Sequence, residues 1–200
     1  MRTYINKKDT AALIRKALKE AFPDMKFSVV SGGSNTCSVL AIRWEDGANE
    51  AQVSAVINRF KGVSFDGMTD STNTRYYLMD GKEVSFYYDY INYHRTNSDA
   101  AIQRAIDQVY HRYTNNFSVA KVEKPTVSQF KNGQLMATVL DGFSPFDDLQ
   151  RLIQKAVSKN SDRLKVNHSA TAAKIFMTHD GGSSQRLHDA LQNFTSNILQ

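Results

Sequence analysis

Two carboxylates lie close together in a short polar segment, SFDGMTDST, at residues 64–72. Asp66 and Asp70 offer the hard oxygen ligands that magnesium and calcium ions take. The segment lacks the twelve-residue spacing and the closing glutamate of a calcium-binding loop. The alternative is a polar turn whose aspartates accept hydrogen bonds from nearby backbone N–H groups. We therefore treat Asp66 and Asp70 as a candidate metal site, with the turn as the competing interpretation.

A second candidate site is the segment at residues 76–95, which holds seven tyrosines and phenylalanines. Aromatic rings beside cations on an open sheet face can stack the bases of single-stranded nucleic acid. The alternative is a core strand, because tyrosine favours strands and can bury its ring while its hydroxyl reaches a polar partner. We predict that one side of this segment is core, and the other side stays open. The candidate residues for binding nucleic acid or a protein partner are Arg75, Tyr77, Lys82, Tyr88, Tyr90 and Arg95.

The chain contains no catalytic signature that spacing alone reveals. It has no G-x-S-x-G motif, and its five histidines form no H-E-x-x-H pair. Gly181 and Gly182 precede a predicted helix whose free N–H groups could bind an anion, but no Walker lysine follows, and ordinary helix capping is the alternative. We therefore expect a non-enzymatic protein that needs no cofactor.

The composition limits the class of protein further. The net charge is +5, and the cationic excess is spread thinly along the chain, so binding to a polyanion is permitted but not demanded. The single cysteine, Cys37, excludes an internal disulfide and fits a reducing compartment. No apolar run approaches the roughly 20 residues that span a bilayer, and the N-terminus lacks a secretory signal pattern. We expect a cytoplasmic protein.

The elements that would position these residues alternate between helix and strand. Apolar residues at helical spacing predict a helix that starts at Asp9 or Thr10 and ends before Pro23. Asn49 and Ser98 (or Asn97) are predicted to cap two further helices, and Asp80-Gly81 predicts a two-residue hairpin turn. The strands predicted in this part are residues 26–31, 37–45, 74–79 and 82–95, the last as one continuous strand.

The second part of the chain gives fewer signals. Residues 114–126 are predicted to connect the two parts, and Ser144 to cap a helix that reaches residue 160. Strands are predicted at residues 133–140, 163–168 and 172–179, the last two as a pair, and a final helix at residues 181–199. The fold class is thus α+β, with a mostly antiparallel sheet packed with helices. We divide it into a domain at residues 1–115 and a smaller α+β segment at residues 116–200.

Four separated blocks of the first part resemble a known family. They are DTAALIRKALKEAFPDMKFSVVS, the W-x-D-G of residues 44–47, FKGVSFDGMTDST and YYDYINYHR. In this order they resemble the large polyvalent protein-associated domain numbered twenty-nine, over about residues 5–115. Residues 116–200 resemble no family that we can name.

This resemblance implies a biological setting and supplies no catalytic residues. Such domains occur in large multidomain proteins of phages and conjugative plasmids, which often combine antirestriction, helicase, primase, peptidase or methyltransferase modules. We therefore expect a non-enzymatic accessory protein of a mobile element that binds a host protein or defence complex. The alternative is a nucleic-acid-binding protein that accompanies the processing of mobile-element DNA.

Overall fold

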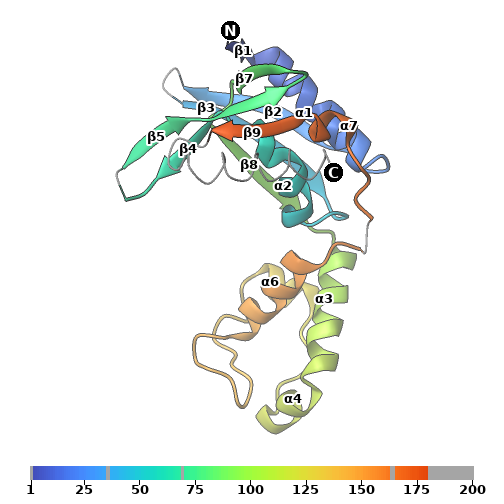
Figure 1. The fold of residues 1–200 in the computed structure, drawn as a ribbon. Coiled ribbons are helices and arrows are strands. Elements are labelled where there is room, and N and C mark those ends of the chain that lie inside the picture. The colour runs from blue at the N-terminus through green and yellow to red at the C-terminus, as the bar shows by residue number, and fades with distance from the viewer. Residues whose placement is uncertain (1, 35–36, 69, 163–164, 180–200) are drawn as a thin grey trace, which may run out of the picture. The chain divides into compact units, whose positions relative to one another are not determined.

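The computed structural model describes residues 2–34, 37–68, 70–162 and 165–179, and it confirms the α+β class (Figure 1). The described residues form two compact units. One takes the described residues within Met1–Trp44, Ala51–His94 and Lys165–Gln200, and the other takes those within Glu45–Glu50 and Arg95–Leu164. These bounds differ from the predicted division at residue 115, because the helix after Ser98 packs within the second unit.

The first unit contains a four-stranded sheet in the order β1-β7-β6-β9. Its strands are β1 (Thr3–Ile5), β7 (Lys82–Phe86), β6 (Tyr76–Met79) and β9 (Ile175–His179). β1 pairs with β7 in parallel, and the other two pairings are antiparallel. The predicted turn between β6 and β7 is confirmed, since Asp80 and Gly81 have φ angles of 49° and 76°.

A second sheet has the order β2-β3-β8 and is formed by β2 (Ser28–Ser34), β3 (Cys37–Glu45) and β8 (Tyr90–Thr96). The prediction of one continuous strand at residues 82–95 is therefore wrong. The chain leaves the first sheet after Phe86 and joins the second at Tyr90. Ser38 of β3 holds this crossing: its backbone N–H donates to Oδ2 of Asp89 at 2.9 Å, and its carbonyl accepts the Asp89 N–H at 3.0 Å.

Helices and a hairpin complete the first unit. α1 (Lys7–Ala21) begins earlier than predicted, because the Asn6 side chain accepts the N–H of Asp9 at 3.0 Å and so caps the helix. Ile14, Ala17 and Leu18 of α1 are fully buried. The other elements are α2 (Glu50–Ile57), the 3₁₀ turn η1 (Asn58–Phe60), the hairpin β4 (Val63–Asp66) and β5 (Ser71–Thr74), and α7 (Ala170–Ala173).

The last described strand corrects the prediction for the C-terminal part. Residues 165–169 form no strand, and β9 pairs with β6 instead. The carboxylate of Glu20 holds the segment before β9, because it accepts the Thr171 N–H at 2.9 Å and the Ser169 hydroxyl at 2.8 Å. The predicted helix at residues 181–199, with Gly181 and Gly182, lies outside the described residues.

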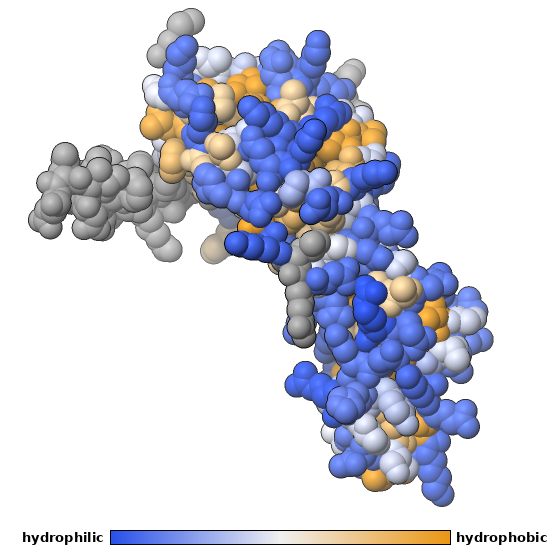
Figure 2. Space-filling model, turned by 90° about the vertical axis from the view of Figure 1, so that its right-hand side faces the viewer, coloured by the Kyte–Doolittle hydropathy of each residue, from blue (hydrophilic) through white to orange (hydrophobic). Residues whose placement is uncertain are grey.

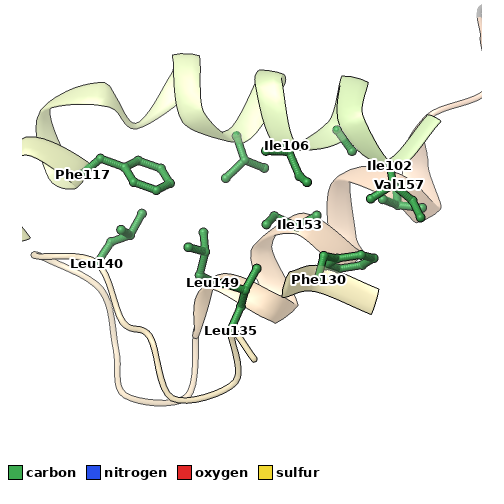
Figure 3. Packing of buried hydrophobic residues seen from close by; sticks show 11 residues of the cluster. Ile102, Ile106, Phe117, Phe130, Leu135, Leu140, Leu149, Ile153 and Val157 are labelled. Atoms are coloured by element: carbon green, nitrogen blue, oxygen red, sulfur yellow. The ribbon is translucent and has the colours of Figure 1, made fainter. Parts of the chain in front are cut away.

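The second unit is helical, with α3 (Asp99–Arg112), α4 (Thr114–Ala120), α5 (Val127–Lys131) and α6 (Leu149–Lys159). Ser98 caps α3 as predicted, but Asp148, rather than Ser144, caps α6. Residues 133–140 form turns, not the predicted strand, and the segment 114–126 contains α4. Figure 3 shows side chains of α3 and α6 facing each other in the core, joined by others from the turns: Ile102, Ile106, Ile153, Val157, Leu135 and Leu140.

The packing of the first unit leaves no space for a side chain at Gly62. A Cβ atom there would lie 2.2 Å from the Phe86 carbonyl oxygen, and the Gly62 N–H donates to Tyr88 O at 2.7 Å. We expect Gly62→Ala to lower the free energy of unfolding by about 3 kcal/mol, measured by chemical denaturation. Gly32→Ala is the control, since its Cβ would meet nothing within 4 Å. Equal losses from the two substitutions would contradict the assignment.

Candidate functional site

The two faces of the four-stranded sheet differ in chemistry. Tyr77, Val84 and Phe86 point to the inner face and are buried. The rings of Tyr77 and Phe86 lie 5.2 Å apart, and that of Phe60 lies 5.4 Å from Phe86. This inner face is the core of the first unit.

The strand register brings together apolar side chains on the opposite face. Leu78 of β6 pairs with Phe176 of β9, and Tyr4 of β1 pairs with Ser85 of β7. Directly paired residues point to the same side of a sheet, and residues two apart on a strand share a face. We call this surface the outer face and define it as Arg2, Tyr4, Tyr76, Leu78, Glu83 and Phe176.

The outer face exposes large apolar side chains. Tyr4 is 61% exposed, Phe176 is 51% exposed and Leu78 is 40% exposed. Figure 2 shows one side of the molecule, on which hydrophobic residues lie in several separate areas among hydrophilic ones. Neighbouring exposed apolar residues from three strands are typical of an interaction surface, whereas single exposed ones need no explanation.

The charges on the outer face compensate each other. The Arg2 guanidinium donates to Glu83 at 2.7 Å and lies 4.4 Å above the centre of the Tyr76 ring. The hydrogen bond to Glu83, with its negative charge, raises the pKa of Arg2. Burial raises the pKa of Tyr4, and Tyr87 and Asp89 add to this effect. The outer face therefore presents the un-ionised phenol of Tyr4 and the ion pair of Arg2 with Glu83, and it has no surplus of cations.

Two of the predicted binding residues, Tyr77 and Tyr88, belong to the core. Tyr88 is fully buried and Tyr77 is 1% exposed. Their hydroxyls donate to the backbone carbonyls of Lys7 and Lys61, at 3.3 Å and 2.6 Å. Because the rings are enclosed and the hydroxyls are paired, neither tyrosine can stack against a visiting base. Tyr77 and Tyr88 are therefore core residues, which was the alternative to a stacking surface.

Arg95 also has a structural role, within the second unit. Its guanidinium donates to four backbone carbonyls: Asp46 at 3.3 Å, Gly47 at 3.1 Å, Val157 at 3.1 Å and Asn160 at 2.7 Å. Burial lowers the pKa of Arg95. A guanidinium that is committed to four carbonyls has little left to offer a phosphate.

The other predicted binding residues are not gathered into one site. Tyr90 is 41% exposed and begins β8, whereas the exposed Lys82 begins β7 in the other sheet. Arg75 is half-buried, and its backbone N–H donates to Gly62 O at 2.7 Å. Burial lowers the pKa of Lys61, and the charge of Arg75 lowers it further.

The candidate metal residues lie in the β4–β5 hairpin. Asp66 ends β4, and its Oδ1 accepts the N–H of Met68 at 2.9 Å, as the turn interpretation expects. Asp70 has a φ of 48° and is exposed. Within the described part of the chain, no three His, Cys, Asp or Glu side chains gather as a metal site would require.

One local pattern in the sequence indicates the outer face. The segment YYLM at residues 76–79 alternates, which places Tyr76 and Leu78 opposite to Tyr77. Tyr4 lies in a strand of three residues, too short for a pattern. Phe176 reaches this face only because β9 pairs with a strand far away in the sequence.

Fold and site together define an α+β protein with an open apolar sheet face. The family model described as large polyvalent protein associated domain 29 matches residues 5–98, which confirms the resemblance for that part of the chain. The match associates the chain with polyvalent proteins of phages and other mobile elements. It begins at residue 5 and ends before β9, so both edges of the outer face, with Arg2 and Tyr4 at one and Phe176 at the other, lie beyond it. No curated protein and no solved structure matches.

One further observation concerns membranes. Among the described residues, no helix has both the length and the apolar character that a membrane span requires.

Arg95 is expected to stabilise the second unit rather than to bind a ligand. Arg95→Met removes the donor to four carbonyls and should lower the free energy of unfolding by about 3 kcal/mol. Arg151→Met is the matched control, because Arg151 is exposed and donates to a single carbonyl, that of Phe146 at 2.8 Å. The control should cost less than about 1 kcal/mol. Thermal and urea denaturation measure both, and equal stabilities of the two variants would refute this role.

Proposed function

We propose that this protein is a non-enzymatic accessory protein of a phage or conjugative element, and that it binds a host protein through the outer face. The single observation that carries the proposal is the exposure of Tyr4, Leu78 and Phe176 on one face of a folded sheet, with Leu78 and Phe176 directly paired. The family match at residues 5–98 supports the mobile-element setting.

The composition of the outer face fits a protein partner. Protein interfaces are enriched in tyrosine, phenylalanine and arginine, and a few residues, often tyrosine, tryptophan or arginine, supply most of the binding energy. Here Tyr4 and Phe176 provide aromatic surface, and Arg2 is held over the ring of Tyr76. An ordered sheet also loses little conformational entropy on binding, because its backbone is already fixed.

Nucleic acid is the less favoured partner for this face. Binding to phosphates requires several cations without partners, but Arg2 is paired with Glu83. Of the tyrosines predicted to stack bases, Tyr77 and Tyr88 are buried. A neutral apolar face suits a protein that presents its own apolar surface.

The kind of host protein follows from the setting. Polyvalent proteins of this family type often carry antirestriction modules, so a component of a host defence complex is the partner that we favour. Its contact surface should be apolar at the centre and polar at the rim, as in other protein interfaces.

The proposal is tested by site-specific crosslinking in the host cell. A photoreactive phenylalanine derivative replaces Leu78 in one variant and Phe65 in the other. Phe65 is 57% exposed on the β4–β5 hairpin and away from the outer face. We expect a defined protein adduct from position 78, absent from position 65, which mass spectrometry identifies. An adduct with nucleic acid at position 78 would instead favour the alternative function.

The identified partner is then purified for binding measurements. Tyr4→Ser/Phe176→Ser should weaken its affinity at least about tenfold, because two exposed aromatic anchors are lost. The matched control is Phe65→Ser/Phe146→Ser, which removes two exposed rings elsewhere. Equal affinities for the two double variants, or equal adducts from positions 78 and 65, would reject the outer face as the binding surface.

A further inference from the structure

A groove runs between α3 and α6 in the second unit. It has a volume of about 400 Å³ and is lined by residues of both helices, among them Gln108, Arg112, Tyr113, Lys155, Lys159 and Asn160. Small-molecule sites commonly begin at about 300 Å³. The side-chain amide of Asn160 donates to Gln108 at 3.1 Å and ties the end of α6 to α3 beside this space.

The cations that line the groove come from two helices. Arg112 lies in the last turn of α3, and Lys155 and Lys159 stand four residues apart on α6, so they share one face of that helix. None of the described residues that line this groove is acidic. Lys155 is paired with Asp147 at 2.9 Å, which compensates one of the three charges.

Such an arrangement is unfavourable for the isolated protein. Like charges four residues apart on a helix destabilise it by about 0.2–0.5 kcal/mol. Part of this cost is offset, because Arg112 and Lys159 lie at the negative ends of their helix dipoles. The ion pair with Asp147 compensates Lys155, so Arg112 and Lys159 are the cations whose charge stays uncompensated in the groove. A bound anion would relieve the repulsion.

We propose that this groove binds a phosphate-bearing ligand, with Arg112, Lys155 and Lys159 as the binding residues. A phosphate group carries close to two negative charges and three acceptor oxygens, so one group can satisfy several converging cations. A carboxylate carries a single charge and would leave the other cations unsatisfied. The guanidinium of Arg112 can engage two phosphate oxygens at once.

A neighbouring hollow limits where in the groove the phosphate of the ligand can bind. A second hollow of about 400 Å³ adjoins it and shares Gln108, Lys159 and Asn160. Its own cation, Arg104, is paired with Asp162 at 2.7 Å. The part near Arg104 is therefore closer to neutral, and the phosphate belongs in the first groove, which Arg112 lines. An extended ligand can continue into the second hollow.

The phosphate can come from a small molecule or from a nucleic-acid strand. Tyr113 lines the groove, but its ring makes an edge contact with Phe143 at 5.0 Å and has the Arg112 guanidinium 5.5 Å away. We therefore derive no base stacking from it and assign only the phosphate chemistry. This inference does not depend on the outer face, which belongs to the other unit.

The test uses the full chain and two probes. Inorganic pyrophosphate is titrated by calorimetry, and a fluorescent oligothymidylate of about 10 nucleotides, within the site size of single-strand binders, by anisotropy. At least one probe should bind, with an affinity that falls as salt rises. Arg112→Gln/Lys159→Gln should weaken that binding at least tenfold.

The control is Lys131→Gln/Arg151→Gln, which removes the same charge from the same unit outside the groove and should leave binding unchanged. Pyrophosphate binding alone supports a small-molecule source, and binding of the strand with the same sensitivity supports nucleic acid. Three results would overturn the proposal: no binding of either probe, equal losses in both double variants, or equally tight binding of an oligoglutamate peptide. Circular dichroism verifies that each variant is folded, and Lys155→Gln gives a second groove variant if Arg112→Gln/Lys159→Gln does not fold.

Discussion

The passage of the chain from one sheet to the other at residues 87–89 is the constraint on which the first unit depends. Ser38 binds Asp89 through its backbone N–H and carbonyl, and Gly62 approaches so closely that its N–H reaches Tyr88 O at 2.7 Å. The ring of Tyr88 is fully buried, and its hydroxyl donates to the Lys7 carbonyl at the start of α1. Because the chain turns at this crossing, β7 belongs to the first sheet and β8 to the second. Alternate residues of β6 and β7 therefore lie on the outer face.

The two units present surfaces of opposite chemistry. In the first, strand register gathers apolar side chains and closes the ion pair of Arg2 and Glu83, which disfavours polyanions. In the second, Arg112 of α3 and Lys155 and Lys159 of α6 line a groove in which no acidic residue is found among the described ones. An apolar sheet suits a protein, and a cationic groove suits a small or extended anion, so our two proposals assign different partners to the two units.

Local signals in the sequence predicted much of the fold. The turn at Asp80-Gly81 and the cap at Ser98 depend on neighbouring residues only, and both are confirmed. The strand at residues 82–95 was predicted as continuous because its residues alternate throughout. The crossing between the two sheets is fixed by Ser38, which lies far away in the sequence, so the local pattern gives no sign of it. The same limit applies to the site: the rings of Tyr77 and Tyr88 have the composition of a stacking surface, and only tertiary packing decides that they are core.

The position of β9 has a consequence for synthesis of the chain. β9 begins at Ile175, whereas its partner β6 ends at Met79, and the helical unit lies between them in the sequence. At a translation rate of about 5–20 residues per second, β6 waits for several seconds with an unpaired edge. Open strand edges recruit other chains. The nascent protein thus passes through an interval in which early folding of the helical segment leaves that edge unpaired.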